Sequence, residues 1–434
     1  MHREESPEWD KLFRFTVSML PEALPYHLKV RDHFRRQTPT WEFFSATRNR
    51  EEQLVSFQTE LLKNTYQFSR ESEPALFEKI DRAREQLGLG SLPVTAYQAQ
   101  YDRDQGNELN ASIIYLHQEA HLVFSGPILE RLNGDELLAV IAHELTHIRL
   151  YTLLDGDLEV ADRIITAIAN NHNSEAVYVE TARLFKLYTE IYCDRGAYAV
   201  LGDPVPVITM LLKLATGLST VNADSYSRQA EAIFSAEPGT QSATPTHPEN
   251  FIRTRALRLW HEQAAAAAPA ITRMIEGLPD LDRLDLFSQQ ELNDLTRDFL
   301  QEYLRPEWFR TTLVTGLAQQ YFRDLFGAPA PAADLATAPS ERQPAQPIPA
   351  EQLVAAIAAL HPGVRTYFGY VLLDFALADP SLEEMPAGRA LEFAAEMELS
   401  AVYDTICKKE LQFSDKKWQQ HKQKVQTAYS TTWK

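Results

Sequence analysis

The sequence predicts a mostly helical α+β protein with more than one domain. Three observations lead to this prediction of fold class and domain organisation. Helical periodicity dominates up to about residue 85 and returns after residue 127, while the stretch between them contains short runs with β-strand character. A Pro- and Ala-rich stretch near the C-terminal end has no periodicity, which is typical of a linker. A chain of 434 residues also exceeds the usual size of one hydrophobic core, so we expect two or three domains.

The β-strand character is confined to residues 94–125. The run VTAYQAQY (94–101) alternates between apolar and polar side chains, as a half-buried strand does. Two further runs, 111–117 and 121–125, flank Gln118–Ala120 and predict a hairpin. We therefore expect a small antiparallel sheet ahead of the second helical part of the chain.

Two long helices follow the predicted sheet. Asn133 is placed to cap the first helix, and Glu136 at the third helical position completes a capping box. Apolar side chains then recur every three or four residues on one face of this helix, at Leu137, Ile141, Leu145 and Ile148. The second helix is expected to begin near Ser174 and to end at Gly202, because Gly-Asp-Pro is a strong stop signal.

The composition separates the chain into five regions. We predict a helical N-terminal region over 1–59, a core domain over 60–262, a helical extension over 263–327, a linker over 328–349 and a helical C-terminal domain over 350–434. In the last region an apolar helix ends in Asp379, Glu383 and Glu384, a pattern that weakly resembles TerB-like helical domains. An acidic surface loop between two helices is the alternative interpretation.

The charge pattern disfavours several classes of function. Lys and Arg number 42 against 60 Asp and Glu, so the net charge is −18. Such an acidic chain is not expected to bind nucleic acids or anionic membranes. No signal-peptide pattern opens the sequence, and its most apolar run, 205–221, is short and contains Lys213, which indicates a buried helix. We expect a cytoplasmic protein without a membrane span.

The first long helix contains the pentad His143-Glu144-Leu145-Thr146-His147. Two histidines four residues apart lie on one face of a helix, so both imidazoles can reach a single zinc ion. The glutamate that follows the first histidine then lies beside the metal, where it can take a proton from water. Two hydrogen-bonded histidines on an ordinary buried helix are the alternative interpretation of this pattern.

A catalytic zinc site needs a third protein ligand, and the second long helix offers one. Glu190 and Asp194 lie one turn apart among apolar neighbours, and a buried carboxylate requires a partner. We predict that Glu190 binds the zinc ion and that Asp194 accepts the free ring N–H of a ligating histidine. Cys193 lies near the same face and is an alternative ligand, although a small buried cysteine also packs as an apolar residue.

This order of motifs resembles the zinc metallopeptidases that include HtpX and the CaaX prenyl proteases, within the gluzincin group. The resemblance covers about residues 60–262 and rests on H-E-x-x-H followed by E-x-x-x-D. Asn110-Ala111 is similar to the family's element before a strand, and His247-Pro248 with Arg253 is similar to its His-Pro-x4-Arg element. The resemblance implies a zincin-like core, one zinc ion and a protein or peptide substrate.

The resemblance also implies roles for single residues. It identifies His143, His147 and Glu190 as zinc ligands, Glu144 as the general base and Asp194 as the residue that orients a histidine ligand. The expected reaction is the attack of a water molecule on a peptide carbonyl, with Glu144 moving the proton to the leaving amine.

Other residues are expected to contact the substrate. The resemblance implies that His247 and Arg253 face the cleft, where they stabilise the oxyanion or position the substrate. It also implies that the strand that contains Asn110 and Ala111 pairs with an extended peptide. His247 has two further interpretations, because a His-Pro pair can merely start a helix, and because the imidazole can supply a fourth zinc ligand.

Two other classes of function fit the same sequence. In one, the chain is a catalytically silent or autoinhibited scaffold that binds or senses proteins, with the C-terminal helices contacting a partner. In the other, His247 or Cys193 completes a structural zinc site with four protein ligands. The presence of the whole pentad together with Glu190 favours the enzyme.

Overall fold

The computed structural model describes residues 22–46, 59–100, 109–116, 119–326 and 348–432. Parts of the predicted N-terminal region and most of the predicted linker lie outside these residues. The chain divides into two compact units, Met1–Gly277 and Leu278–Lys434, which we name the N-terminal unit and the C-terminal unit.

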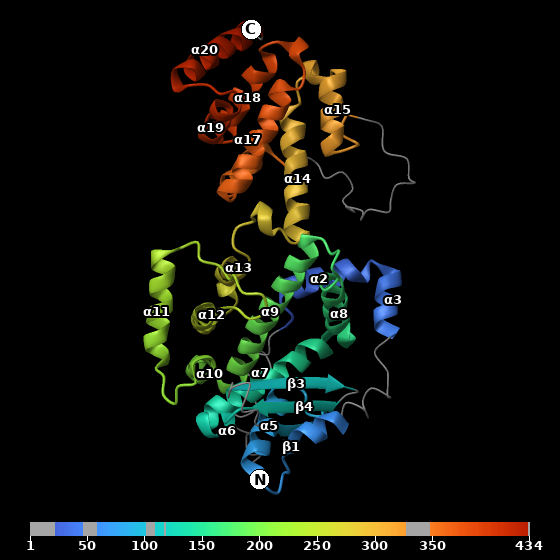
Figure 1. Ribbon diagram of the computed structural model, residues 1–434, viewed down its shortest axis with the longest axis vertical. Coiled ribbons are helices and arrows are strands. Elements are labelled where there is room, and N and C mark those ends of the chain that lie inside the picture. Colours follow the sequence, from blue (N-terminus) through green and yellow to red (C-terminus); the bar gives the residue numbers. More distant parts are fainter. Residues whose placement is uncertain (1–21, 47–58, 101–108, 117–118, 327–347, 433–434) are drawn as a thin grey trace, which may run out of the picture. The chain divides into compact units, whose positions relative to one another are not determined.

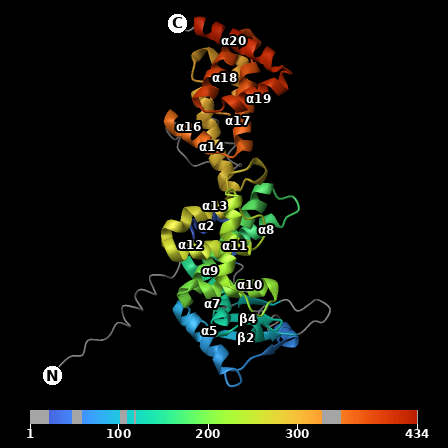
Figure 2. The ribbon, with the colours of Figure 1, turned by 90° about the vertical axis from the view of Figure 1, so that its left-hand side faces the viewer.

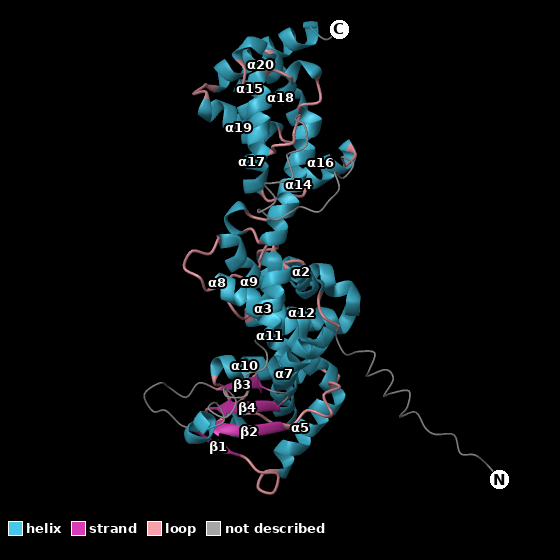
Figure 3. Ribbon diagram, turned by 90° about the vertical axis from the view of Figure 1, so that its right-hand side faces the viewer, coloured by secondary structure: helices cyan, strands magenta, loops and turns pink. Residues whose placement is uncertain are grey.

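The N-terminal unit contains all the elements that carry the predicted site residues (Figure 1). Its described helices are α2 (Pro25–Arg35), α3 (Thr38–Ala46), α5 (Pro74–Gln86), α6 (Ile128–Arg131), α7 (Gly134–Thr152), α8 (Asp157–Ala169), α9 (Ala176–Leu201), α10 (Pro204–Thr216), α11 (Ala223–Ala236), α12 (Asn250–Gln263) and α13 (Ala268–Glu276). Its described strands are β1 (Thr65–Gln67), β2 (Val94–Ala99), β3 (Asn110–Leu116) and β4 (Glu119–Ser125). All described strands thus belong to this unit, as the magenta arrows of Figure 3 show.

The four strands form a single sheet in the order β1-β2-β4-β3. β3 and β4 make the predicted antiparallel hairpin, and β1 pairs antiparallel with β2. β2, however, pairs with β4 in parallel, so the sheet is mixed and the expectation of a purely antiparallel sheet is wrong. The reason is topological: β2 enters beside β4 rather than beside its sequence neighbour β3. This arrangement leaves β3 at one edge of the sheet.

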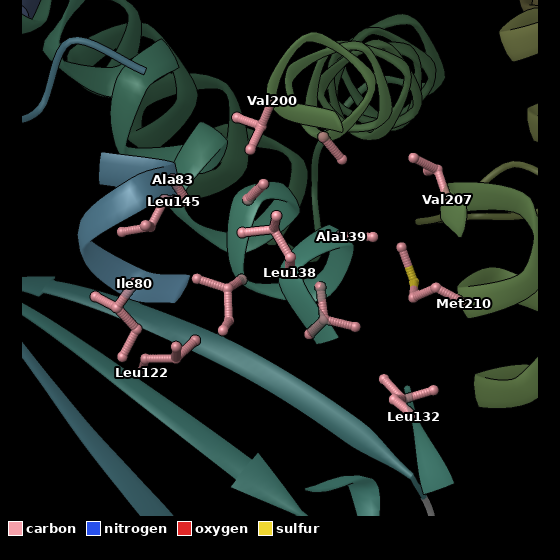
Figure 4. Close-up of a cluster of buried hydrophobic side chains, with 14 of the residues drawn as sticks. Ile80, Ala83, Leu122, Leu132, Leu138, Ala139, Leu145, Val200, Val207 and Met210 are labelled. Atoms are coloured by element: carbon pink, nitrogen blue, oxygen red, sulfur yellow. The ribbon is translucent and has the colours of Figure 1, made fainter. Parts of the chain in front are cut away.

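One face of the sheet packs against α5 and α7. Figures 1 and 2 both place α7 beside the strands, with α10 next to it. Figure 4 shows side chains from α5, β4, α7, α9 and α10 that meet in this core. Leu122 of β4 and Leu138 and Leu145 of α7 are almost completely buried there. Burial of such apolar surface is the main stabilising contribution to a fold of this kind, and here it fixes α7 on the sheet.

The boundaries of the two long helices follow from local sequence signals. Asn133 accepts hydrogen bonds from the backbone of Asp135 and Glu136, and the Glu136 carboxylate accepts one from the backbone of Asn133, so the predicted capping box starts α7. Gly202 ends α9 in the left-handed conformation with φ of 74°, which glycine adopts without strain. Asp203 then caps α10.

α7 and α9 pack closely where Thr146 faces Gly196. A β-carbon placed on Gly196 would lie 2.0 Å from Thr146 Oγ1, well inside van der Waals contact. Thr146 is itself fully buried and donates a hydrogen bond to the carbonyl of Ala142. Glycine in the middle of a helix costs about 1 kcal/mol relative to alanine, so the close approach of the two helices explains its presence at this position.

The C-terminal unit is helical in all its described parts. It contains α14 (Leu286–Tyr303), α15 (Thr312–Tyr321), α16 (Ala350–Ala358), α17 (Pro362–Leu377), α18 (Met385–Glu396), α19 (Ser400–Glu410) and α20 (Asp415–Thr432). α14 and α15 share one buried core with the helices after the predicted linker, and the ring of Phe299 contacts those of Phe368 and Phe393. The division between the units thus falls before α14. Asp379, from the predicted acidic cluster, caps a turn by accepting hydrogen bonds from Ser381.

One described helical stretch, Gly134–Ala169, is long and apolar enough to cross a membrane by length and composition. Of its most apolar window, however, 61% is buried inside the protein. The run expected to be the most apolar, 205–221, instead forms the shorter helix α10 and the loop after it. The mostly helical α+β fold class is confirmed.

Candidate metal centre

α7 and α9 bring the three predicted metal ligands together. His143 and His147 lie one turn apart on α7, and Glu190 extends from α9, which packs along it. Glu190 Oε2 lies 3.4 Å from His143 Nε2, and Glu190 Oε1 lies 3.7 Å from His147 Nε2. His143 and Glu190 are buried, while the side chain of His147 is 21% exposed. The side chains therefore converge on one point between the two helices.

The spacing of these donors fits a tetrahedral zinc ion. Ligand atoms held about 2.1 Å from the metal at tetrahedral angles are separated from each other by about 3.4 Å. The measured separations of 3.4 and 3.7 Å are close to that value. Two imidazoles and one carboxylate are also a donor set that zinc accepts in catalytic sites. The residues present thus have the donor chemistry and the spacing that suit a zinc ion.

Asp194 orients the first histidine, and Arg253 holds Asp194. His143 Nδ1 donates a hydrogen bond of 3.1 Å to Asp194 Oδ1, which leaves Nε2 directed towards Glu190. Arg253 from α12 donates two hydrogen bonds to Asp194, of 2.8 and 2.6 Å, and its Nη2 also lies 3.4 Å from Glu190. Buried ligands need such partners to fix the tautomer and orientation of the ring.

The charges at the site shift the pKa values of its groups. Burial lowers the pKa of His143, but hydrogen bonds to Asp194 and Glu190 outweigh this effect and raise the pKa to about 10. Burial lowers the pKa of His147 to about 4, against the opposing charge of Glu190. Although burial opposes ionisation of Glu190, the hydrogen bond from His143 and the charge of Arg253 hold the pKa of this carboxyl well below its usual range. Glu190 is therefore ionised and ready to bind a cation.

Glu144 lies beside the predicted metal ligands. It lies on α7 directly after His143 and lines the same cavity as the metal ligands. Burial raises the pKa of Glu144 to about 7, and the nearby charge of Glu190 adds to the shift while His143 opposes it. A carboxylate with a pKa near neutrality is suited to take up and release a proton at physiological pH.

A cavity of about 620 Å³ lies over the ligands and reaches the edge strand of the sheet. His143, Glu144, His147 and Glu190 line its floor. Asn110 and Ala111, predicted to contact substrate, line its wall as the first residues of β3. Because β3 is an edge strand, its outer backbone is open to pairing within the part of the sheet that the structure describes. The cavity therefore borders the edge of the sheet.

His247 reaches the site from a loop. Its side chain is 63% exposed, its Nε2 lies 3.6 Å from Glu190 Oε1, and its Nδ1 is hydrogen-bonded to Thr246. The loop is fastened to α9, because Arg183 donates hydrogen bonds to the carbonyls of Ser242 and Thr244. The structure thus brings His247 to the cavity as expected. Arg253 also lines the cavity, but its guanidinium is engaged by Asp194.

Cys193 lies close to the two histidines. Its sulfur and the ring nitrogens of His143 and His147 all lie within 4.8 Å of one another. The thiol is completely buried, and burial raises its pKa well above the usual range. A thiol in this environment stays protonated in the absence of a metal, which matches the interpretation of Cys193 as a packing residue.

Sequence reasoning missed two features of the site. It did not find the pairing of Arg253 with Asp194, although a buried aspartate beside a histidine signals the need for a cation. It also did not find the contact between Thr146 and Gly196, for which the glycine inside a long helix was the available signal.

Residues 72–261 match the model of peptidase family M48. The matched segment begins just before α5 and ends within α12, so it contains the sheet and the helices that carry the site residues. This segment is a peptidase family M48 domain. The family resemblance predicted from the motifs is confirmed, and all the predicted site residues lie inside the matched segment.

The chain is also similar to the plastoglobule-localized metallopeptidase 48, chloroplastic, of Arabidopsis thaliana. The two are 28% identical over 156 residues, which cover 32% of this chain and 44% of that relative. The chain thus matches less than half the length of this relative. No solved structure matches the chain. Family M48 peptidases are metal-dependent hydrolases that act on proteins or peptides.

Proposed function

We propose that the chain is a zinc-dependent metalloendopeptidase that cleaves protein or peptide substrates. The observation that carries the proposal is the convergence of His143, His147 and Glu190 at the spacing of zinc ligands, on the floor of a cavity that Glu144 also lines. The family match supports the reaction class, since it covers the whole ligand set.

The chain's own residues perform most of the proposed reaction. A zinc ion held by the three ligands supplies a Lewis acid that activates water and polarises the substrate carbonyl. β3 pairs with the backbone of the substrate and holds the scissile bond over the ligands. Glu144 takes the proton of the attacking water and passes it to the leaving amine. His247, at the exposed rim, donates a hydrogen bond to the oxygen on which negative charge develops.

The substitution Glu144→Gln tests the proposal. It removes the base without removing a metal ligand, so we expect zinc content to remain and hydrolysis of a generic protein substrate to fall by at least about 10³-fold. The matched control is Glu130→Gln, which changes an exposed carboxylate on α6 outside the described cavity lining and should retain activity. A fully active Glu144→Gln variant would contradict the mechanism.

A structural zinc site in a catalytically silent scaffold is the second candidate, and the position of Cys193 favours it. In that case the thiolate completes a closed set of four ligands, and the helical C-terminal unit contacts a protein partner. The substitution Cys193→Ala separates the two functions, because it leaves a three-ligand catalytic site able to hold zinc and turn over substrate. Loss of zinc from Cys193→Ala, with no turnover by the unsubstituted protein, would favour the scaffold.

A further inference from the structure

We propose that the cavity binds a basic side chain of the substrate, from one of the two residues directly before the cleaved bond. This inference rests on the proposed peptidase function and names a class of substrate for it. The observations that carry it come from the end of the cavity that the last turn of α7 and the helix α8 form. Asp162 of α8 is the residue that would pair with the substrate cation.

Four polar residues form this end of the cavity. They are Tyr151 from α7 and Glu159, Asp162 and Arg163 from α8. Tyr151 lies one helical turn after the proposed ligand His147, on the same face of α7. Because one cavity is lined both by the proposed metal ligands and by these four residues, a substrate bound at the ligands can also reach the side chains of α8.

The guanidinium of Arg163 is engaged by other partners. Its Nε lies 2.7 Å from Glu159 Oε1, so these two opposite charges balance each other. Its Nη2 donates a hydrogen bond of 2.7 Å to the carbonyl of Phe44 on α3. The ion pair and the hydrogen bond hold the side chain of Arg163 from two sides. Arg163 therefore balances the charge of Glu159 and leaves that of Asp162 to be considered separately.

Asp162 has hydrogen-bond partners, but both of them are neutral hydroxyl groups. Tyr151 donates a hydrogen bond of 2.8 Å to its Oδ2, and Thr166 donates one of 3.2 Å to its Oδ1. Within the part of the chain that the structure describes, no cation forms an ion pair with this carboxylate. Burial raises the pKa of Asp162, although the hydrogen bond from Tyr151 and the charge of Lys186 oppose the shift. A carboxylate in such a position is stabilised by a cation that arrives with a ligand.

Tyr151 adds a second acceptor beside this carboxylate. Its proton is directed to Asp162, so its oxygen can accept a further hydrogen bond. The ammonium of lysine and the guanidinium of arginine need such acceptors, and their long alkyl stems can lie along the cavity wall. An acidic side chain would instead bring a second negative charge next to Asp162. This end of the cavity therefore favours basic side chains over neutral ones and disfavours acidic ones.

The edge strand indicates which part of the substrate reaches α8. Asn110 at the start of β3 pairs with Ser125, from which the chain continues through α6 into the start of α7. β3 and α7 therefore begin at the same end of the cavity, and Figure 1 shows the arrow of β3 pointing to the side of the view where α8 lies. Antiparallel pairing is slightly more stable than parallel pairing. A substrate antiparallel to β3 places the residues before the cleaved bond at the α8 end.

The distance along α7 limits the choice to two substrate residues. One helical turn, from His147 to Tyr151, corresponds to a rise of about 6 Å. Neighbouring residues of an extended chain lie about 3.3 Å apart, so two of them span about the same length. The basic side chain that pairs with Asp162 therefore belongs to the first or the second residue before the cleaved bond.

Cleavage of a peptide library by the zinc-loaded protein tests the inference. The library varies the two residues before the cleaved bond in peptides with a blocked N-terminus, and mass spectrometry identifies the products. We expect kcat/KM for Lys or Arg at one of these positions to exceed that for Gln by about tenfold and that for Glu by about 100-fold. A free α-amino group is another cation that suits Asp162. Cleavage of unblocked peptides alone would assign the site to that group and overturn the inference.

Acetyl-lysine in the substrate provides the second test, because it keeps the alkyl stem of lysine and removes the charge. Replacement of lysine by acetyl-lysine should lower kcat/KM of the unsubstituted protein by about tenfold, and it should have little effect on Asp162→Asn, which has no charge to pair. The matched control Asp157→Asn removes a carboxylate from the same helix that pairs with Arg35 and lies outside the described cavity lining. This control should keep the tenfold loss. An equal loss in Asp162→Asn and in the unsubstituted protein would contradict the assignment.

The comparison of peptides on the unsubstituted protein decides the question even if Asp162→Asn does not fold. Equal cleavage of basic, neutral and acidic residues before the bond, or a basic preference after the bond, would overturn the inference while leaving the peptidase function intact. If the zinc-loaded protein cleaves no peptide of the library, while zinc binding is intact, the peptidase function itself is contradicted and the inference falls with it.

Discussion

The candidate metal centre combines two kinds of structure, a pair of packed helices and a segment that follows α11. α7 and α9 supply the proposed ligands His143, His147 and Glu190, and the Glu190 oxygens lie 3.4 and 3.7 Å from the two histidine nitrogens. The second segment, 242–253, supplies His247, which is 63% exposed, and Arg253, which is buried. The helix pair builds the ligand set from periodicity and close packing. The second segment contributes the ion pair of Arg253 with Asp194 and the exposed imidazole ring of His247.

The substitution Arg253→Met tests the buried contribution of the second segment and should have the largest effect. It leaves the buried carboxylate of Asp194 without its cation, and breaking a buried pair in this way costs about 3–5 kcal/mol of unfolding free energy. The pKa of Asp194 lies below its usual range, because the nearby Arg253 and its hydrogen bonds outweigh the effect of burial. Denaturant unfolding of the metal-free protein measures the loss.

Arg258→Met on the same helix provides the control. Arg258 pairs with Asp224, whose side chain is 68% exposed, and exposed pairs contribute less than about 1 kcal/mol. Similar losses in the two variants would mean that Arg253 contributes no more than an ordinary surface residue.

The exposed ring of the second segment is tested by His247→Ala. If His247 donates to the developing oxyanion, its removal should lower kcat by about 10²-fold with little change in zinc affinity. If the imidazole is instead a fourth zinc ligand, zinc affinity should fall and kcat of the loaded enzyme should be retained or rise. Zinc titration and steady-state kinetics on the same preparation distinguish these outcomes.

Gly196→Ala tests the close packing of the helix pair. The added methyl would lie 2.0 Å from Thr146 Oγ1, so the helices must separate, which costs about 1–3 kcal/mol and moves Glu190 relative to the histidines. We expect lower stability and weaker zinc binding. The double variant Thr146→Gly/Gly196→Ala removes the side chain on α7 that the new methyl group on α9 would meet. It should restore part of the lost stability and part of the lost zinc affinity. Absence of any rescue would show that the contact does not set the ligand geometry.

The contrast between the two kinds of structure also explains what could be predicted from the sequence. The helix pair follows from spacing, because i and i+4 positions share a face, and the capping box at Asn133 and the stop at Gly202 mark the ends of the helices. The i, i+4 spacings on the two helices predict the ligand set His143, His147 and Glu190, and the Glu190 oxygens lie 3.4 and 3.7 Å from the two histidine nitrogens.

The features that sequence could not supply depend on long-range packing. The parallel pairing of β2 with β4 depends on which strand inserts between two others, and the alternation of side chains contains no information on that order. The ion pair of Arg253 with Asp194 joins residues 59 positions apart. The division between the units before α14 likewise follows from a core shared across the predicted linker, which local composition does not reveal.

The smallest expected effect concerns the protons that are released when zinc binds, and not the free energy of unfolding. In the metal-free protein the hydrogen bonds to Asp194 and Glu190 outweigh burial and raise the pKa of His143 to about 10, so its Nε2 carries a proton below that pH. Zinc must displace this proton, and zinc affinity should therefore rise with pH and level off above about pH 10, by up to about tenfold per pH unit. His147, with a pKa of about 4, is already neutral in this range.

Calorimetric titration of zinc in buffers with different ionisation enthalpies measures the proton release. At about pH 8.5 the carboxyl of Glu144, with a pKa of about 7, is already ionised, so the proton displaced from His143 adds about one proton per zinc ion to any proton released by zinc-bound water. Leu218→Arg, on the surface, should give the same number. Binding without proton release at this pH would mean that His143 is neutral before zinc arrives, and that the two carboxylates on α9 hold the ring in place without charging it.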